Sequence, residues 1–280
     1  MYKQRATWQM FFCTLTLSIS GFYPHPKPYE YPMISFEYAP SYYRYVETVL
    51  SDASDSQEVY MTLTSAPVAH KLTAIMKRYL SYDWYNQTDT SFILGNVDYT
   101  SSNAGSVSGQ DNLIFVLQTT LNHCWANAYC VGLGYGFRYL DNDSRHSITT
   151  TGNFGYEREN YLHYLPIVLT AERLFHNQRF NRFQLQTKGY YLLDGNQISK
   201  YSKLGCESDM HNRQNTGYGA EIIARLYAND RKWYYGIGAQ YWQIEASDTV
   251  RIPCFDGNHY GNEPDNTTTM ISAVIGYIVH

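Results

Sequence analysis

The residues of this chain that could do acid–base chemistry are carboxylates and histidines in polar segments between apolar runs. A carboxylate beside a histidine can orient and deprotonate an attacking water. These residues have no fixed spacing from the apolar runs, so solvated loops explain them more simply than an active site. We therefore assign no catalytic residue and keep catalysis as a less favoured hypothesis. The candidates are Asp141, Asp143, His146, His211, Asp256 and His259.

Metal and cofactor chemistry has little support in the sequence. The run Asp141-Asn142-Asp143-Ser144 is similar to the start of a calcium loop but lacks the glycine and the distal glutamate. No C-x-x-C pair is present, and Lys and Arg are scattered rather than clustered. We expect no metal, no cofactor and no nucleic-acid partner.

The segment 129–140 predicts the element that would position any site. Every second residue from Tyr129 to Tyr139 is large and apolar or aromatic, and the alternate positions hold Cys130, three glycines and Arg138. A period of two is typical of a β-strand. A small and charged face has little to pack against in a soluble sheet. In a transmembrane barrel, apolar side chains face lipid and small or polar ones face the lumen.

Ten such strands are predicted, and the connections between them alternate between long and short. A five-residue turn is expected at 85–89, and the longest connections at 141–155, 195–215 and 247–266. Outer-membrane barrels have short periplasmic turns and longer external loops in this order. The pattern predicts a closed antiparallel barrel rather than a two-sheet sandwich, with strands near 35–47, 70–84, 91–101, 112–123, 129–140, 156–174, 182–194, 216–227, 232–246 and 267–280.

Charged residues recur on the face predicted to line the lumen. Lys77 and Arg78 are adjacent, so one of them would join this set, and a bulge would reconcile the pair. Pro166 predicts a second bulge or kink. Because unpaired buried charge is costly, acids and bases in a narrow lumen should pair. The predicted network comprises Glu37, Asp98, Arg138, Glu172, Lys188, Glu221 and Arg225.

Composition and the N-terminus agree with an exported barrel. The chain has 280 residues, 29 of them Tyr, and only 16% are charged. Residues 1–20 combine two bases with an apolar stretch, which predicts a secretory signal peptide cleaved after Ser20, although an uncleaved anchor is the alternative. Residues 21–32 contain four prolines and predict an extended periplasmic tail, followed by a single barrel domain over 33–280.

Four cysteines remain after removal of the leader with Cys13, in an oxidising compartment. We expect Cys124–Cys130 and Cys206–Cys254 disulfides, although four cysteines allow three pairings. Tryptophans near the strand ends, among them Trp84, Trp125, Trp233 and Trp242, are interpreted as membrane-interface anchors. His163 falls on the outward face, where an interfacial role is favoured over lipid-modifying chemistry.

Several runs resemble a family of bacterial outer-membrane β-barrel proteins. They are Y-C-V-G-L-G-Y-G-F-R-Y-L-D-N-D, G-Y-E-R-E-N-Y-L-H-Y-L-P-I-V-L and N-E-P-D-N-T-T-T before the last strand. The resemblance implies a Gram-negative outer membrane, contact with lipopolysaccharide and phospholipid, and insertion by the barrel-assembly machinery. Such proteins commonly end in Phe or Tyr, whereas this chain ends in Val279-His280. Omptin proteases resemble it in strand number, but their acid and His spacing at the rim is not reproduced.

Three functions follow from this architecture. The favoured one is a surface-exposed structural or interaction protein of the adhesin type, with a charge-plugged lumen and loops that contact a host or surface ligand. The second is a narrow, porin-like channel for ions or small solutes. The third is an omptin-like or lipid-modifying hydrolase.

Overall fold

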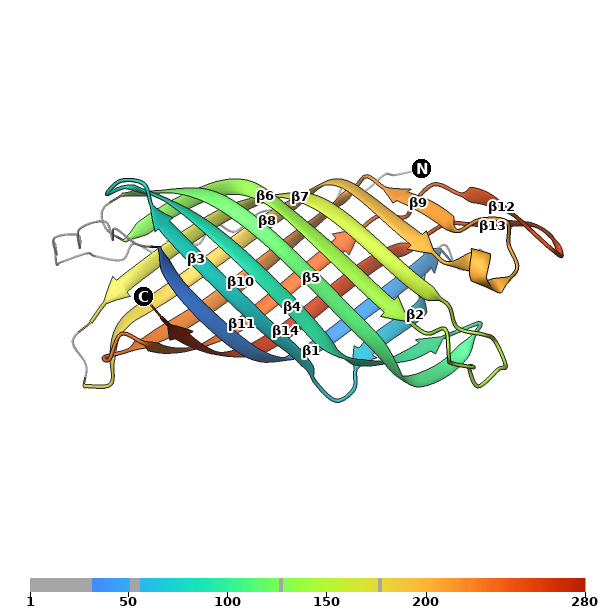
Figure 1. Cartoon of the computed structure of the whole chain (residues 1–280), viewed down its shortest axis with the longest axis horizontal. Helices are drawn as coiled ribbons and strands as arrows, with labels where there is room; N and C mark the ends of the chain where they lie inside the picture. Colours follow the sequence, from blue (N-terminus) through green and yellow to red (C-terminus); the bar gives the residue numbers. More distant parts are fainter. Residues whose placement is uncertain (1–31, 51–55, 126–127, 176–177, 280) are drawn as a thin grey trace, which may run out of the picture.

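The computed structural model describes residues 32–50, 56–125, 128–175 and 178–279, and Figure 1 shows their arrangement. The elements are almost entirely β-strands. Their bounds are β1 (Met33–Leu50), β2 (Gln57–Ser65), β3 (Ala69–Tyr79), β4 (Trp84–Ser101), β5 (Gly105–Trp125), β6 (Tyr129–Asp143), β7 (Glu157–Leu174), β8 (Phe180–Ser199), η1 (Tyr201–Leu204), β9 (Met210–Gln214), β10 (Gly217–Ala228), β11 (Trp233–Ile244), β12 (Val250–Cys254), β13 (Gly257–Gly261) and β14 (Asp265–Ile278).

Twelve strands form one antiparallel sheet that closes on itself. β2 and β3 both pair with β1 and β4 and act as one interrupted wall strand. β9 and β10 both pair with β8 and act as another. The wall therefore has ten strands, and β14 closes it against β1. The predicted ten-stranded barrel is confirmed.

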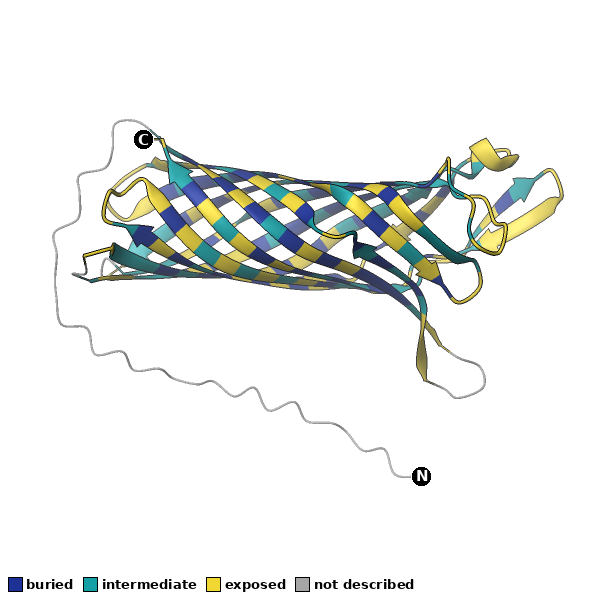
Figure 2. Cartoon of the chain, turned by 90° about the horizontal axis from the view of Figure 1, so that it is seen from below, coloured by how far each residue is buried: buried dark blue, intermediate teal, exposed yellow. Residues whose placement is uncertain are grey.

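The outer face of the barrel carries the large apolar side chains. On β6, Leu133 is 55% exposed and Tyr135 is 48% exposed, whereas Gly132, Gly136 and Arg138 on the opposite face are buried. The alternation of buried and exposed positions runs along the strands in Figure 2. An apolar outer wall and a polar lumen are the arrangement that a lipid bilayer selects.

Connections differ at the two ends of the barrel. At one end, where β1 begins and β14 ends, neighbouring strands are joined by short turns; we call it the short-turn end. The other end, with β9, β12 and β13, is the long-loop end (Figure 1). None of the described residues forms a helix long and apolar enough to cross a membrane.

Two predicted connections were wrong in extent. The five-residue turn at 85–89 is part of β4, and the turn lies just before Trp84. The Gly/Ser segment after Ser101 is mostly strand, because β4 and β5 continue to a tight turn before Gly105. In both places polar residues that looked like turn formers complete ladder pairs with a neighbouring strand.

The predicted bulges also need correction. β3 pairs in unbroken register with β1 and β4, so no bulge separates Lys77, which faces the lumen, from Arg78, which faces outward. A register shift does occur near Pro166, but its extra residue, Leu193, lies in β8. Beyond Leu193 the inward positions of β8 change from even to odd numbers.

The predicted signal peptide at 1–20 and all but Pro32 of the tail at 21–32 lie outside the described residues and stay predictions. Three of the predicted interface tryptophans, Trp84, Trp125 and Trp233, are 40–48% exposed and all lie beside short turns. Aromatic residues at this level are typical of a membrane interface.

Candidate functional site

The lumen is filled in successive layers, and the inward residues of β8 mark their order. From the short-turn end these are Gln184 and Gln186, then Lys188, then Tyr190, and after the bulge Gln197. All are buried. The packing of the lumen differs from one of these levels to the next.

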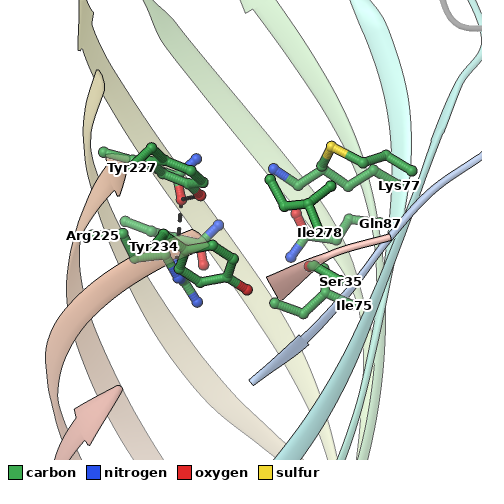
Figure 3. Close-up of a pocket in the computed structure, with 11 residues that line it drawn as sticks. Ser35, Ile75, Lys77, Gln87, Arg225, Tyr227, Tyr234 and Ile278 are labelled. Atoms are coloured by element: carbon green, nitrogen blue, oxygen red, sulfur yellow. Dashed lines mark hydrogen bonds between the residues drawn. The ribbon is translucent and has the colours of Figure 1, made fainter. Parts of the chain in front are cut away.

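The first layer centres on Arg225 of β10. Its Nε donates to Glu37 Oε1 at 2.8 Å, and a terminal nitrogen donates to Gln184 Oε1 at 3.3 Å. Figure 3 shows Arg225 with Tyr227 and Tyr234 on one side of a small cavity, and Lys77 on the other. The cavity has a volume of about 20 Å³. That volume holds one or two water molecules, not a metabolite.

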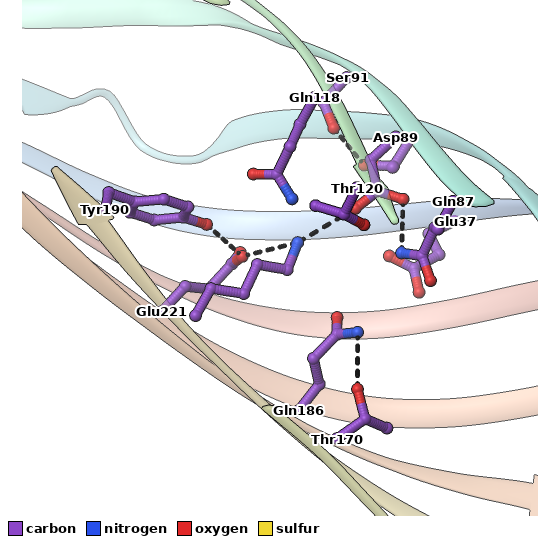
Figure 4. A network of polar contacts seen from close by, with 12 residues as sticks. Glu37, Gln87, Asp89, Ser91, Gln118, Thr120, Thr170, Gln186, Tyr190 and Glu221 are labelled. Carbon is purple, nitrogen blue, oxygen red and sulfur yellow. Dashed lines mark hydrogen bonds and ion pairs between the residues drawn. The ribbon is translucent and has the colours of Figure 1, made fainter. Parts of the chain in front are cut away.

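The second layer centres on Lys188. Its Nζ lies 3.1 Å from both Asp89 and Glu221, and Lys71 approaches Glu221 at 3.5 Å. Tyr190 donates its hydroxyl to Glu221 at 2.8 Å (Figure 4). Two carboxylates and two ammonium groups from four strands thus neutralise one another across the lumen. Mutual pairing offsets the desolvation of each group and closes the bore at this level.

The third layer is aromatic. The rings of Tyr190 and Trp242 stack with an interplanar angle of 2° at 4.8 Å, and Tyr164 meets both edge-on at about 5 Å. All three side chains are at most 5% exposed. Trp242 therefore belongs to the lumen, and its predicted role as an interface anchor was wrong. Its indole is large enough to fill the space left by the small residue Gly219.

An apolar cluster and a second cavity follow toward the long-loop end. Tyr43, Leu63, Ile93, Ile114 and Leu140 are among the buried members of the cluster. The second cavity also measures about 20 Å³, and its lining includes Tyr45, Arg138, Leu140, Asn142, Arg158 and Asn160. We call it the outer cavity. Neither cavity joins the two ends of the barrel.

A buried ion triad lies at the long-loop end. One terminal nitrogen of Arg158 contacts Glu47 at 2.5 Å and Glu263 at 2.7 Å. Burial raises the pKa of Glu263 to about 7, with Glu47 adding to the shift and Arg158 opposing it. Two carboxylates thus share one guanidinium, so that one of them holds its proton more tightly than an ordinary glutamate.

The structure places all but one of the predicted lumen residues inside the barrel. Glu37 with Arg225, and Glu221 with Lys188, are paired in the lumen as described. Glu172 lies near the short-turn end and meets Arg182 at 3.5 Å. Arg138 is buried but makes no ion pair within the described chain. Sequence reasoning missed five further charged residues that form ion pairs inside the barrel or at its rim: Glu47, Lys71, Asp89, Arg158 and Glu263.

The placement of Asp98 was wrong. It is exposed on the outer face and accepts the backbone N–H of Gly109 at 3.1 Å, while Val97 is buried inside. The inward positions of β4 are set by Gln87, Asp89 and Ser91, all of odd number. Starting the strand at 91 hid this pattern, and reading back to Trp84 would have revealed both the correct face and Asp89.

The acid and His candidates do not converge on one site. Asp141 and Asp143 are outward-facing near the end of β6, where Asp143 pairs with Arg145. His211 lies in β9, and His163 is outward on β7, hydrogen-bonded to Tyr135. His146 follows β6 in the next connection.

The closest acid–His pair is His259 Nε2 with Asp256 Oδ1, 2.8 Å apart on the exposed hairpin. The Sγ of Cys254 is near this pair but is bonded in a disulfide. A disulfide sulfur is not the thiolate that a metal requires. With Cys254 in a disulfide, the described residues offer the pair no third ligand.

Both disulfides are present. Cys124 and Cys130 link β5 to β6 at the short-turn end. Cys206 and Cys254 link the connection after η1 to the β12–β13 hairpin, supported by backbone bonds from Glu207 to Pro253 at 2.9 Å and from Phe255 to Gly205 at 3.1 Å. The Asn212 side chain also donates to the hairpin backbone at Gly261. The hairpin is thus fixed to the rim, while Phe255 at its turn is fully exposed.

No protein-family model and no curated protein matches this chain. Among solved structures, it is similar to the outer membrane protease OmpT from Escherichia coli, with a TM-score of 0.51, 11% identity, and coverage of 88% of this chain and 95% of that one. An outer membrane channel from Pseudomonas putida F1 has a TM-score of 0.39 and 12% identity, covering 92% and 100%. The translocator domain of the autotransporter NalP from Neisseria meningitidis has a TM-score of 0.38 and 8% identity, and the match covers 88% of each chain.

At these identities the likeness concerns the fold. Together with the apolar outer wall, it defines the class: the chain is a transmembrane β-barrel of the bacterial outer-membrane type. A multi-strand barrel of this class is surrounded by membrane lipid.

Proposed function

We propose that this barrel is a surface-exposed interaction protein of the adhesin type, in which the barrel is a plugged anchor and the long-loop end binds a host or surface ligand. The observation that carries the proposal is the β12–β13 hairpin. It is tied to the rim by Cys206–Cys254 and leaves Phe255 and Tyr260 exposed. A rigid hairpin loses little conformational entropy when a partner binds its aromatic side chains.

The filled lumen supports the same proposal. The Lys188 cluster and the Tyr164, Tyr190 and Trp242 rings occupy the bore between two cavities of about 20 Å³ each. A barrel selected for transport would need a continuous polar path, whereas a barrel used as an anchor needs only a stable wall.

Adhesion of bacteria that display the protein tests the proposal. Cells displaying the native chain should adhere to epithelial monolayers or matrix-coated surfaces, and the Phe255→Ser/Tyr260→Ser variant should lose most of that adhesion, about tenfold. Phe154→Ser is the matched control, because Phe154 is 71% exposed in a different connection. Adhesion no greater than that of cells without the protein would contradict the proposal.

A narrow channel is the second candidate, supported by the polar side chains that occur in the lining of both cavities, such as Gln87 and Asn142. Planar-bilayer recordings of refolded protein distinguish the two candidates. A plugged anchor gives no unitary current, whereas steady single-channel steps would show that the lumen conducts.

An omptin-like or lipid-modifying hydrolase is the third candidate, and the fold likeness to OmpT is its support. If such an activity were found, His163→Ala, His211→Ala and His259→Ala would each be assayed for it. Full activity in all three would remove these three histidines as candidates.

A further inference from the structure

Arg138 is a buried cation without a partner. Its side chain projects inward from β6 and the residue is 6% exposed. Over the part of the chain that the structure describes, it makes no ion pair and no side-chain hydrogen bond. Arg225 and Lys188 are similarly buried, yet each has a carboxylate within 3.1 Å. Arg138 is therefore an exception to the pairing seen in the neighbouring layers.

Burying a guanidinium is costly where no opposite charge compensates for the water that it loses. The ionisable side chains nearest Arg138 include the phenols of Tyr43, Tyr164 and Tyr45. A phenol offers at most a weak partial charge to a cation. Among the described residues, no carboxylate forms an ion pair with Arg138, although Arg225 and Lys188 are both paired.

Two buried polar groups in the layers around Arg138 lack hydrogen-bond partners and can donate to a guest. The hydroxyl of Tyr43 is buried and unpartnered, and so is the indole Nε1 of Trp242, which packs against Tyr164 at 5.1 Å. The hydroxyl of Tyr45 is used, because it donates to Glu47. The Tyr43 hydroxyl can donate or accept and the indole can only donate, so both groups are able to donate toward negative charge in this part of the lumen.

Arg138 lines the outer cavity, whose volume of about 20 Å³ corresponds to one or two water-sized particles. Arg158 also lines this cavity, but Glu47 and Glu263 already occupy its guanidinium. Those carboxylates would repel an anion from the Arg158 side. We propose that the outer cavity binds one small monovalent anion of halide size, held by the guanidinium of Arg138.

The size of the cavity restricts the ligand class. Sulfate, phosphate or a carboxylate metabolite is several times larger than a water molecule and would displace Leu140 or Leu63 of the cavity wall. A bound halide would neutralise Arg138 within the barrel. The anion is therefore a structural component of the lumen and not a transported solute.

Crystals of the refolded barrel grown in sodium bromide test the site directly. An anomalous bromide peak is expected in the outer cavity at hydrogen-bonding distance from an Arg138 nitrogen, about 3.2–3.5 Å. Density without anomalous signal at that place would mean water alone and would overturn the proposal.

Thermal unfolding provides a test in solution. At constant ionic strength, replacing gluconate by chloride should raise the unfolding midpoint of the native barrel saturably, by roughly 3–10 °C. Arg138→Gln should abolish this dependence. The matched control is the double variant Glu37→Gln/Arg225→Gln, which removes an equally buried guanidinium together with its carboxylate and should retain the chloride response.

An unfolding midpoint that is the same in chloride and gluconate would contradict the proposal, as would a chloride response that survives Arg138→Gln. If Arg138→Gln does not fold, the bromide experiment on the unaltered chain decides.

Discussion

The ring of Tyr164 lies directly over Gly136 on the neighbouring strand. A Cβ placed on Gly136 would come within 2.1 Å of the Tyr164 Cζ, which is closer than two non-bonded carbon atoms can approach. The same relationship joins Gly276 to Tyr234. Gly136 of β6 and Gly276 of β14 thus each leave room for a large ring from the adjacent strand.

Gly136→Ala should therefore destabilise the barrel by about 1–3 kcal/mol, because Tyr164 must leave its stack with Tyr190 and Trp242. Urea unfolding of refolded protein measures the change. Gly189→Ala is the control, since a Cβ at Gly189 meets nothing within 4 Å. Equal stability of the two variants would show that the Tyr164 ring can move freely.

The Glu37–Arg225 pair predicts strong coupling in a double-mutant cycle. Arg225→Met alone leaves a carboxylate in a buried layer and should cost about 3–5 kcal/mol. The double variant Glu37→Gln/Arg225→Met should cost clearly less than the sum of the two single changes, because the double variant leaves no unpaired charge at this pair. Additive losses, measured by urea unfolding, would contradict direct pairing.

The raised pKa of Glu263 predicts a pH dependence with a definite sign. Between the ordinary glutamate pKa and about 7, the folded protein binds more protons at this site than the unfolded chain does. The contribution of Glu263 to the free energy of unfolding therefore falls as pH rises through that window, by on the order of 1–3 kcal/mol.

Glu263→Gln isolates this effect, since glutamine keeps the shape but does not titrate. The stability difference between the native chain and Glu263→Gln should shift in favour of the variant from pH 5 to pH 8. A difference independent of pH over this range would refute the role assigned to the triad.

Loss of the Cys206–Cys254 disulfide should loosen the rim without affecting the wall. Cys206→Ser/Cys254→Ser should become sensitive to brief proteolysis within 200–209 and 247–262, because the hairpin keeps its backbone hydrogen bonds and the Asn212 contact but loses its covalent link to the rim. The heat resistance of the barrel, followed by circular dichroism, should stay unchanged. Cleavage at the same rate as in the native chain would show that the disulfide is not needed to fix the hairpin.

The wall was predictable because lipid imposes a strict rule on every strand. The period-two pattern of β6 placed Leu133 and Tyr135 outside and Gly136 and Arg138 inside, as observed. Strand number followed from counting such patterns. Rules of this kind depend only on neighbours along the chain.

The site was less predictable because its partners come from distant strands and from irregular positions. Leu193 adds one residue to β8, so the face of later residues cannot be read by alternation from Lys188. Glu263 lies outside any strand and reaches Arg158 only through the fold. Asp89 and Asp98 were misplaced because turn-like composition concealed the start of β4.

The seam between β1 and β14 joins the first and last strands of the barrel along positions 35–48 and 265–278. One edge of β1 therefore has no hydrogen-bonded neighbour until β14 pairs with it. During insertion that edge would expose its amide and carbonyl groups to hydrocarbon, a state that bilayers tolerate poorly. Pairing of β14 with β1 therefore satisfies the last open strand edges of the wall, and closure of the barrel depends on β14.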